Sequence, residues 1–272
     1  MKRAPHSFAE TLRGKALTLL FEKPSLRTRY TFEIAIQQLG GFAVTSSGMV
    51  GERDPLKDVA RNLERWTQGI VARVFTQQTI DDLAQWARVP VVNALSDLYH
   101  PCQALADVQT IRERFGRWDG LKLAYVGDGN NVAHSLMLTA GRLGMSISVA
   151  CPAGYEPNAA IVAQARAAGV TVDIVSEAAE AASGAHVIYT DVWASMGQES
   201  EALERQRIFA PYQVDESLMA RAASDAIFLH CLPAKRGLEV TDAVMESPQS
   251  AIFDQAENRL HAQKALLAML LQ

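Results

Sequence analysis

The chain has 272 residues, of which 49% are hydrophobic and 21% are charged, and its formal net charge is -4. This length is enough for one large domain or for two domains of ordinary size. The slightly acidic balance excludes the broad basic surface that nucleic-acid-binding proteins use, and no apolar run approaches the roughly 20 residues that span a bilayer. We therefore expect neither a nucleic-acid partner nor a membrane-spanning segment.

The three cysteines, Cys102, Cys151 and Cys231, are too few and too scattered for a disulfide framework. They form no Cys-x-x-Cys pair, and the sequence has no zinc-type spacing of cysteine and histidine, so we expect no metal. Residues 1–6 carry no apolar segment of a secretory signal. Reduced thiols and a cytoplasmic location are the expectations.

Strand-like runs alternate with helical patterns along the chain, beginning with an apolar run at 16–21 and a helical segment at 30–39 that ends at Gly40 and Gly41. Further strands are expected at 69–74, 89–93, 121–126, 146–150, 171–175, 186–190, 226–229 and 251–253. Helical patterns cover 58–66, 104–115, 133–143, 158–168 and 257–272. This alternation predicts an α/β fold with parallel sheets flanked by helices.

A polar, glycine-bearing stretch at 114–120 interrupts the alternation, which starts afresh at Leu121. We therefore expect two domains, 1–116 and 117–256, each a parallel sheet flanked by helices, with helices joining them. The apolar-faced helix at 257–272 is expected to pack back on the first domain. Ligands of such sheets bind beyond the carboxyl ends of the strands.

The first motif follows the first strand and combines hydroxyl and guanidinium groups in the run Ser25, Leu26, Arg27, Thr28 and Arg29. It lies where a helix begins, so backbone N–H groups and the helix macrodipole add to its affinity for negative charge. Arginine forks match phosphate oxygens two at a time. The run therefore predicts a site for a phosphorylated or strongly anionic small molecule.

A second motif, at 126–132, has the glycines of a dinucleotide-binding turn, Gly127 and Gly129, but lacks the third glycine. The next strand ends at Cys151 and Pro152 without an acidic residue for a ribose, which argues against a nicotinamide enzyme. Asn130 and Asn131 then remain, either as donors to a carboxylate or as helix caps.

Four further residues at the ends of expected elements each have a functional and a purely structural interpretation. His100 precedes Pro101 and suits catalysis, although a single histidine is more often structural. Arg73 and Arg259 suit an anion but would equally be surface arginines. Cys231 lies beside His230 after an apolar strand and would otherwise be a small buried hydrophobe. The loop at 191–199 offers Asp191 and Ser195 to an ammonium group, or is a solvated turn.

Taken in chain order, these motifs resemble the aspartate/ornithine carbamoyltransferase family. They are Ser-x-Arg-Thr-Arg, an arginine at a strand end, His-Pro-x-Gln, Gly-Asp-Gly-Asn-Asn, Asp-Val-Trp-x-Ser-Met-Gly, His-Cys-Leu-Pro and Glu-Asn-Arg, between residues 22 and 259. The fifth and sixth mark the ornithine branch. The resemblance implies transfer of the carbamoyl group from carbamoyl phosphate to the δ-amine of L-ornithine, giving L-citrulline and phosphate. Arginine biosynthesis is the expected setting, with a catabolic direction as the alternative. It also implies a homotrimer and no cofactor.

The resemblance implies that the phosphate is held by Ser25, Arg27 and Thr28 and by the backbone of Leu26. Arg73 and His100, with Thr28, would polarise the carbamoyl carbonyl. The remaining groups implied to bind carbamoyl phosphate are Gln103, Cys231, the carbonyl of Leu232, and Arg259.

On the ornithine side, the resemblance implies that Asn131 and the backbone of Met196 hold the carboxylate. Asp191 with Ser195 would hold the α-amine, and Cys231 would contact the δ-amine. Only an unprotonated amine attacks, so a nearby thiolate or carboxylate must help to remove a proton. The implied catalytic residues are thus Arg73, His100, Asp191 and Cys231.

Two departures from the family pattern, and several rival substrates, accompany this expectation. Family members carry one further helix ahead of the region that begins here, so Met1 is expected to mark a truncation or a naturally short form. Met49 stands where a Gln or His commonly enters the neighbouring subunit's site. The rival acceptors are N-acetylornithine, N-succinylornithine, putrescine and aspartate. Acylated amines would not need Asp191 and Ser195, and putrescine would not need Asn131. A catalytically silent paralogue is the remaining alternative.

Overall fold

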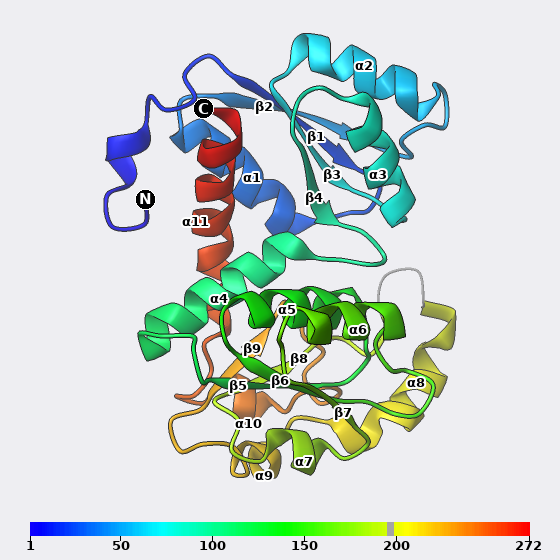
Figure 1. Cartoon of the computed structure of the whole chain (residues 1–272), viewed down its shortest axis with the longest axis vertical. Coiled ribbons are helices and arrows are strands. Elements are labelled where there is room, and N and C mark those ends of the chain that lie inside the picture. The colour runs from blue at the N-terminus through cyan, green and yellow to red at the C-terminus, as the bar shows by residue number, and fades with distance from the viewer. Residues whose placement is uncertain (195–198) are drawn as a thin grey trace. The chain divides into compact units, whose positions relative to one another are not determined.

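The structure is a computed structural model of the chain, and it describes residues 1–194 and 199–272. The chain forms two compact units, of which unit 1 comprises Met1–Ala106 with Glu257–Gln272 and unit 2 comprises Asp107–Ala256 (Figure 1). Helices α4 (Pro101–Phe115) and α11 (Ile252–Leu271) each begin in one unit and end in the other. The predicted α/β fold with two parallel sheets flanked by helices is confirmed.

Unit 1 is built on a parallel sheet with the strand order β2–β1–β3–β4. Its strands are β1 (Ala16–Phe21), β2 (Phe42–Ser47), β3 (Gly69–Arg73) and β4 (Val91–Leu95). All residues of β1 and β3 are buried, as expected for central strands that are covered on both faces. Strand β2 lies at the edge of the sheet, where Phe42 and Val44 are exposed.

Helices cover both faces of this sheet. Helix α1 (Leu26–Gln38) and helix α11 share one apolar core with β1, and α2 (Leu56–Trp66) and α3 (Gln77–Trp86) form a second core on the other face (Figure 1). Phe32, Ala35 and Ile36 recur at helical spacing in α1 and are fully buried. A short 3-10 helix, Pro5–Phe8, precedes these elements.

Unit 2 is built on a parallel sheet with the strand order β7–β6–β5–β8–β9. Its strands are β5 (Lys122–Val126), β6 (Ser146–Ala150), β7 (Val172–Val175), β8 (Val187–Thr190) and β9 (Ile227–His230). The chain moves outward in one direction from β5 to β7 and then returns to the other side of β5 at β8. A reversal of this kind marks the place where open α/β sheets bind ligands.

Helices α5 (Asn131–Arg142) and α6 (Ala159–Ala167) cover one face of this sheet. The other face packs against α7 (Ala178–Ala182), α8 (Ala202–Phe209), α9 (Glu216–Met219), α10 (Asp242–Met245) and a 3-10 turn at Ala210–Tyr212. A further 3-10 turn, Glu199–Glu201, precedes α8. Among the described residues, no helix combines the length and the apolar character needed to cross a membrane.

Several local predictions differ from the structure. The strand predicted at 251–253 is wrong, because Ile252 begins α11, which therefore starts five residues before the predicted helix at 257. An apolar run of only three residues has no period that would separate a strand from the first turn of a buried helix. Strand β2 was not predicted, since this exposed edge strand lacks a strong apolar run. Helix α3 and the short helices α7, α8, α9 and α10 were not predicted either.

Candidate functional site

In unit 1, the segment after β1 leads directly into the N-terminus of α1. Ser25 is the N-cap residue in an extended conformation, and its side chain accepts no capping hydrogen bond from the helix. The first turn of α1 contains no acidic residue. The positive end of the helix macrodipole is therefore not compensated locally, which is the condition that favours binding of an external anion.

The buried guanidinium of Arg259 connects this turn to α4. Its Nη2 donates to Thr28 Oγ1 over 2.7 Å, and its Nη1 donates to Gln103 Oε1 over 2.9 Å. All three side chains are buried. The surface interpretation of Arg259 is therefore wrong, and the structure brings together three residues that the sequence had placed at one anion site.

His100 lies immediately before α4 and is buried close to Arg73, the last residue of β3. Burial, followed by the positive charges of Arg259, Arg73 and Arg27, lowers the pKa of His100 well below its ordinary value of 6.5. The imidazole is therefore neutral at neutral pH and has one N–H to donate. Unit 1 thus presents three guanidinium charges around a neutral donor, an arrangement suited to a phosphate joined to a polar carbonyl.

Two further residues near this site, Cys102 and Glu22, have structural rather than chemical parts. Burial raises the pKa of Cys102 to about 12, so this thiol is not a nucleophile at neutral pH. Glu22, which the sequence analysis did not single out, accepts backbone N–H groups of Val50 at 2.9 Å and Phe75 at 2.7 Å. It ties the segments after β2 and β3 to the end of β1, and the nearby Met49 is exposed. The signal in the sequence that could have revealed Glu22 is its position as an acidic residue just beyond a buried strand.

In unit 2, the glycine-rich turn after β5 is shaped for close backbone packing. A Cβ at Gly129 would lie 2.2 Å from the backbone nitrogen of Pro157, so only glycine fits there. Asn130 caps α5, with its Oδ1 accepting from the N–H groups of Val132 at 2.9 Å and Ala133 at 3.3 Å. The capping interpretation of Asn130 is confirmed, and Asn131 is the first residue of the helix.

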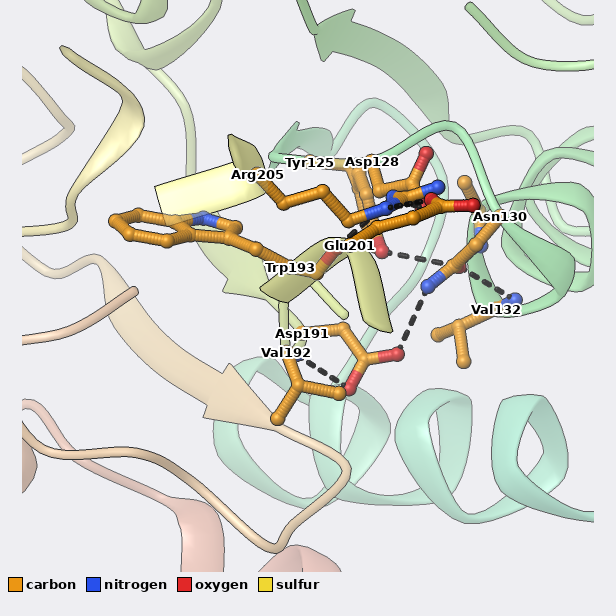
Figure 2. Close-up of polar contacts among 10 residues, drawn as sticks. Tyr125, Asp128, Asn130, Val132, Asp191, Val192, Trp193, Glu201 and Arg205 are labelled. Atoms are coloured by element: carbon orange, nitrogen blue, oxygen red, sulfur yellow. Dashed lines mark hydrogen bonds and ion pairs between the residues drawn. The ribbon is translucent and has the colours of Figure 1, made fainter. Parts of the chain in front are cut away.

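Asp191 leaves the carboxyl end of β8, and its buried carboxylate accepts hydrogen bonds from Val192, Cys231 and Asn130. Figure 2 shows those from Val192 and Asn130. Oδ1 accepts from the backbone N–H of Val192 at 2.8 Å and from Cys231 Sγ at 2.9 Å. Oδ2 accepts from Asn130 Nδ2 at 2.9 Å. The structure thus brings Asp191 and Cys231 together as predicted, and Asp191 is not part of a simple solvated turn.

A buried arginine that the sequence analysis missed braces the same segment (Figure 2). The Nη1 of Arg205, on α8, donates to Asp128 Oδ2 at 2.9 Å and to the carbonyl of Trp193 at 3.0 Å, while its Nε donates to Glu201. Burial raises the pKa of Asp128, and the charge of Arg205 partly opposes that rise. The turn after β5 and the segment after β8 are therefore held by one charge-assisted cluster.

His230, the last residue of β9 and the neighbour of Cys231, forms a buried pair with Glu239. The backbone N–H of Leu232 donates to Nδ1 of His230 at 2.9 Å, so the ring hydrogen is on Nε2, which lies 3.2 Å from Glu239 Oε1. Leu232 has φ of 60°, a left-handed conformation that is costly for a branched residue and is often found at functional sites. Sequence spacing gave no sign of Glu239.

Asp191, His230 and Cys231 place one potential metal-ligand atom each within 4.8 Å of one another. Both ring nitrogens of His230 are engaged by Leu232 and Glu239, and the thiol donates to Asp191. His230 therefore has no lone pair available for a metal in this arrangement. The predicted residues Ser195 and Met196 lie outside the described residues.

Comparisons with known proteins identify the family to which both units belong. The model of the aspartate/ornithine carbamoyltransferase carbamoyl-P binding domain matches residues 1–113, and that of the Asp/Orn binding domain matches residues 119–270. The ornithine carbamoyltransferase of Acidothermus cellulolyticus is 55% identical over 94% of this chain and 85% of its own length. That of Thermococcus kodakarensis is 52% identical over 98% and 86%.

A solved structure, the ornithine carbamoyltransferase from Pyrococcus furiosus, superposes with a TM-score of 0.93 at 50% identity, covering 96% of this chain and 86% of that one. Both halves of the sequence are thus matched by models of the same family, and the fold is matched as well. The chain belongs to the aspartate/ornithine carbamoyltransferase family.

Proposed function

We propose that this chain transfers the carbamoyl group of carbamoyl phosphate to the δ-amine of L-ornithine, giving L-citrulline and phosphate. The observation that carries the proposal is the pair of sites with opposite charge. Unit 1 gathers Arg27, Arg73 and Arg259 around neutral His100, and unit 2 buries Asp191 against Cys231. One site suits an anionic carbamoyl donor, and the other suits a cationic acceptor.

In unit 1, Ser25, Arg27, Thr28 and the backbone of Leu26 bind the phosphate. Arg73 and neutral His100 donate to the carbonyl oxygen, which becomes negative as the tetrahedral transition state forms. Arg259 and Gln103 are already joined by a hydrogen bond, so they are positioned as a unit for the carbamoyl group.

In unit 2, Asp191 binds the α-ammonium group, while Asn131 binds the carboxylate; the roles predicted for Ser195, Met196 and Leu232 stay predictions. Cys231 removes a proton from the δ-ammonium when the thiol is ionised. The free amine then attacks the carbamoyl carbon, the bond from that carbon to the phosphate oxygen breaks, and the amine's second proton leaves with the phosphate.

The free α-amine of ornithine distinguishes it from most rival acceptors. N-acetylornithine and N-succinylornithine carry no α-ammonium, and a buried carboxylate without a cationic partner is costly. Putrescine would leave Asn131 without a carboxylate. Citrulline is a precursor of arginine, so we place the reaction in arginine biosynthesis. A cytoplasmic location is supported by the three cysteines, which are all free thiols.

We further propose that the chain acts as a homotrimer, as the family resemblance implies. The edge of unit 1 formed by α1 and β2 exposes several large apolar side chains, namely Leu26, Tyr30, Ile34, Phe42 and Val44. The first three recur every four residues along α1, so they share one face of that helix. Such a concentration at one edge is typical of a protein interface.

The direct test is a citrulline assay with L-ornithine, beside the matching product assays with N-acetylornithine and putrescine. L-ornithine should be the preferred acceptor, with kcat/KM at least about 100-fold above the others, since a missing ammonium or carboxylate leaves buried polar groups unpaired. Preference for either rival acceptor, or no turnover at all, would contradict the proposed function.

Replacing Arg27 by Ala should weaken carbamoyl phosphate binding by about 1.5–3 kcal/mol for each charged hydrogen bond lost. Arg29→Ala is the matched control, because Arg29 is two residues away but exposed and paired with Glu33 at 2.9 Å. Calorimetric titration with carbamoyl phosphate measures both variants. Equal affinities of the two variants would refute the phosphate assignment.

Replacing Cys231 by Ser should lower kcat by about 100-fold or more and change its pH profile. The wild-type rate should rise with pH as the thiol ionises, whereas a hydroxyl has no such ionisation. Cys151→Ser is the control, since burial raises the pKa of Cys151 to about 12. If Cys231→Ser keeps the wild-type pH profile, the thiol is only a packing residue.

Replacing Tyr30 by Lys should lower the molecular mass in solution, because a charge at the centre of an apolar interface must be buried unpaired. Leu203→Lys is the control, being 75% exposed on α8 in unit 2. Light scattering on the wild type and both variants gives the masses. A monomeric wild-type chain, or a trimer unaffected by Tyr30→Lys, would show that this surface does not mediate assembly.

A further inference from the structure

Asn130 carries out two tasks at once, because both ends of its side-chain amide are used (Figure 2). Its Oδ1 accepts from the backbone N–H of Val132 and from the Tyr125 hydroxyl at 3.1 Å, while its Nδ2 donates to Asp191. A backbone N–H can only donate, so it must face the amide oxygen. The helix N-terminus therefore forces the amide nitrogen toward the carboxylate.

Tyr125 reinforces that orientation. Burial, followed by the negative charges of Asp191, Asp128 and Cys231, raises the pKa of Tyr125 well above its ordinary value of 10. The hydroxyl thus keeps its hydrogen and donates it to Asn130. Its ring stacks on Tyr189 with centroids 5.7 Å apart, which fixes the hydroxyl in place.

The orientation of Asn130 determines how many hydrogen bonds the Asp191 carboxylate can still accept. A carboxylate has about four positions at which its two oxygens accept a hydrogen bond. Val192 and Cys231 occupy both positions on Oδ1, and Asn130 occupies one on Oδ2. In the part of the chain that the structure describes, one position on Oδ2 therefore stays open for an ammonium hydrogen.

We propose that Asn130 is a positioning residue that turns the Asp191 carboxylate so that this one acceptor position meets the α-ammonium of the acceptor substrate, with Tyr125 locking the Asn130 amide. The inference rests on the proposed function and deepens it. It assigns to Asn130 a part in selecting a free amine over an acylated one, acting through Asp191 without touching the substrate.

Asn130→Asp separates positioning from capping. Aspartate caps helices as well as asparagine, so α5 keeps its N-cap. An ionised aspartate cannot donate to Asp191, and two carboxylates at hydrogen-bond distance cannot both be ionised, so they share a proton until the pH rises. The other ionisable groups around Asp191 are His230 at the end of β9, Cys231 after it, Tyr125 and Tyr189, and Asp128 with its partner Arg205.

The experiment measures KM for L-ornithine and for carbamoyl phosphate from about pH 6 to about pH 9. Calorimetric binding of L-norvaline, which has the α-ammonium and carboxylate of ornithine without the δ-amine, is measured beside them. We expect Asn130→Asp to raise the ornithine KM and the norvaline Kd by about tenfold or more at alkaline pH. The defect should shrink at acidic pH, where the shared proton replaces the lost hydrogen bond, and the carbamoyl phosphate KM should stay unchanged.

Two further variants make the test decisive. Asn158→Asp is the matched control, because Asn158 caps α6 by accepting from Ala160 at 2.9 Å and is exposed; it should behave as the wild type. Tyr125→Phe should raise the ornithine KM by about two- to fivefold, and it decides the question if Asn130→Asp does not fold.

An active wild-type chain whose Asn130→Asp and Tyr125→Phe variants bind ornithine normally would overturn the inference. An increase in KM that is equal for both substrates and independent of pH would also overturn it, since that is the result expected if Asn130 acts only as the N-cap of α5. A wild-type chain that makes no citrulline would refute the proposed function, and this inference with it.

Discussion

Parallel pairing is the constraint that creates the site in unit 2, because it brings the carboxyl ends of neighbouring strands to one edge. Val126 of β5 pairs with Thr190 of β8, and Thr190 pairs with His230 of β9. The next residue of each strand therefore leaves the sheet at the same level. Asp191 and Cys231 are those next residues, which is why their side chains meet although 40 positions separate them. A shift of register by one residue would end this contact.

Charge is distributed between the units in a way that suits two substrates of opposite sign. In unit 1, guanidinium groups surround a histidine whose pKa is lowered, so the positive charge remains on the arginines and the imidazole acts as a neutral donor. In unit 2, the buried carboxylate of Asp191 accepts hydrogen bonds from neutral donors, and under the proposed function its charge would meet the cationic acceptor. Each unit is thereby polarised before any substrate arrives, which is the condition for electrostatic catalysis.

The sequence was sufficient for the fold class and for the residues that follow strands, because both depend on local patterns. Asp191 and Cys231 could be predicted in this way, whereas the Arg205 brace could not, since Asp128 lies 77 residues from it. Glu239 was missed for a similar reason: nothing in its local sequence indicates that its carboxylate is buried against His230. The predicted domain ranges and residue roles, including that of Arg259, stay predictions. Short exposed elements such as β2 leave too weak a periodic signal.

The division of the chain has a consequence for its synthesis. Unit 2 is one continuous segment, but unit 1 takes its last helix from Glu257–Gln272. Leu267 and Leu271 of that helix complete the core around Leu17 and Leu19. On a ribosome that adds about 5–20 residues per second, β1 and α1 would wait on the order of 10 s for these partners while unit 2 is made. The unit that emerges first is thus finished last, and its apolar face stays uncovered during that interval.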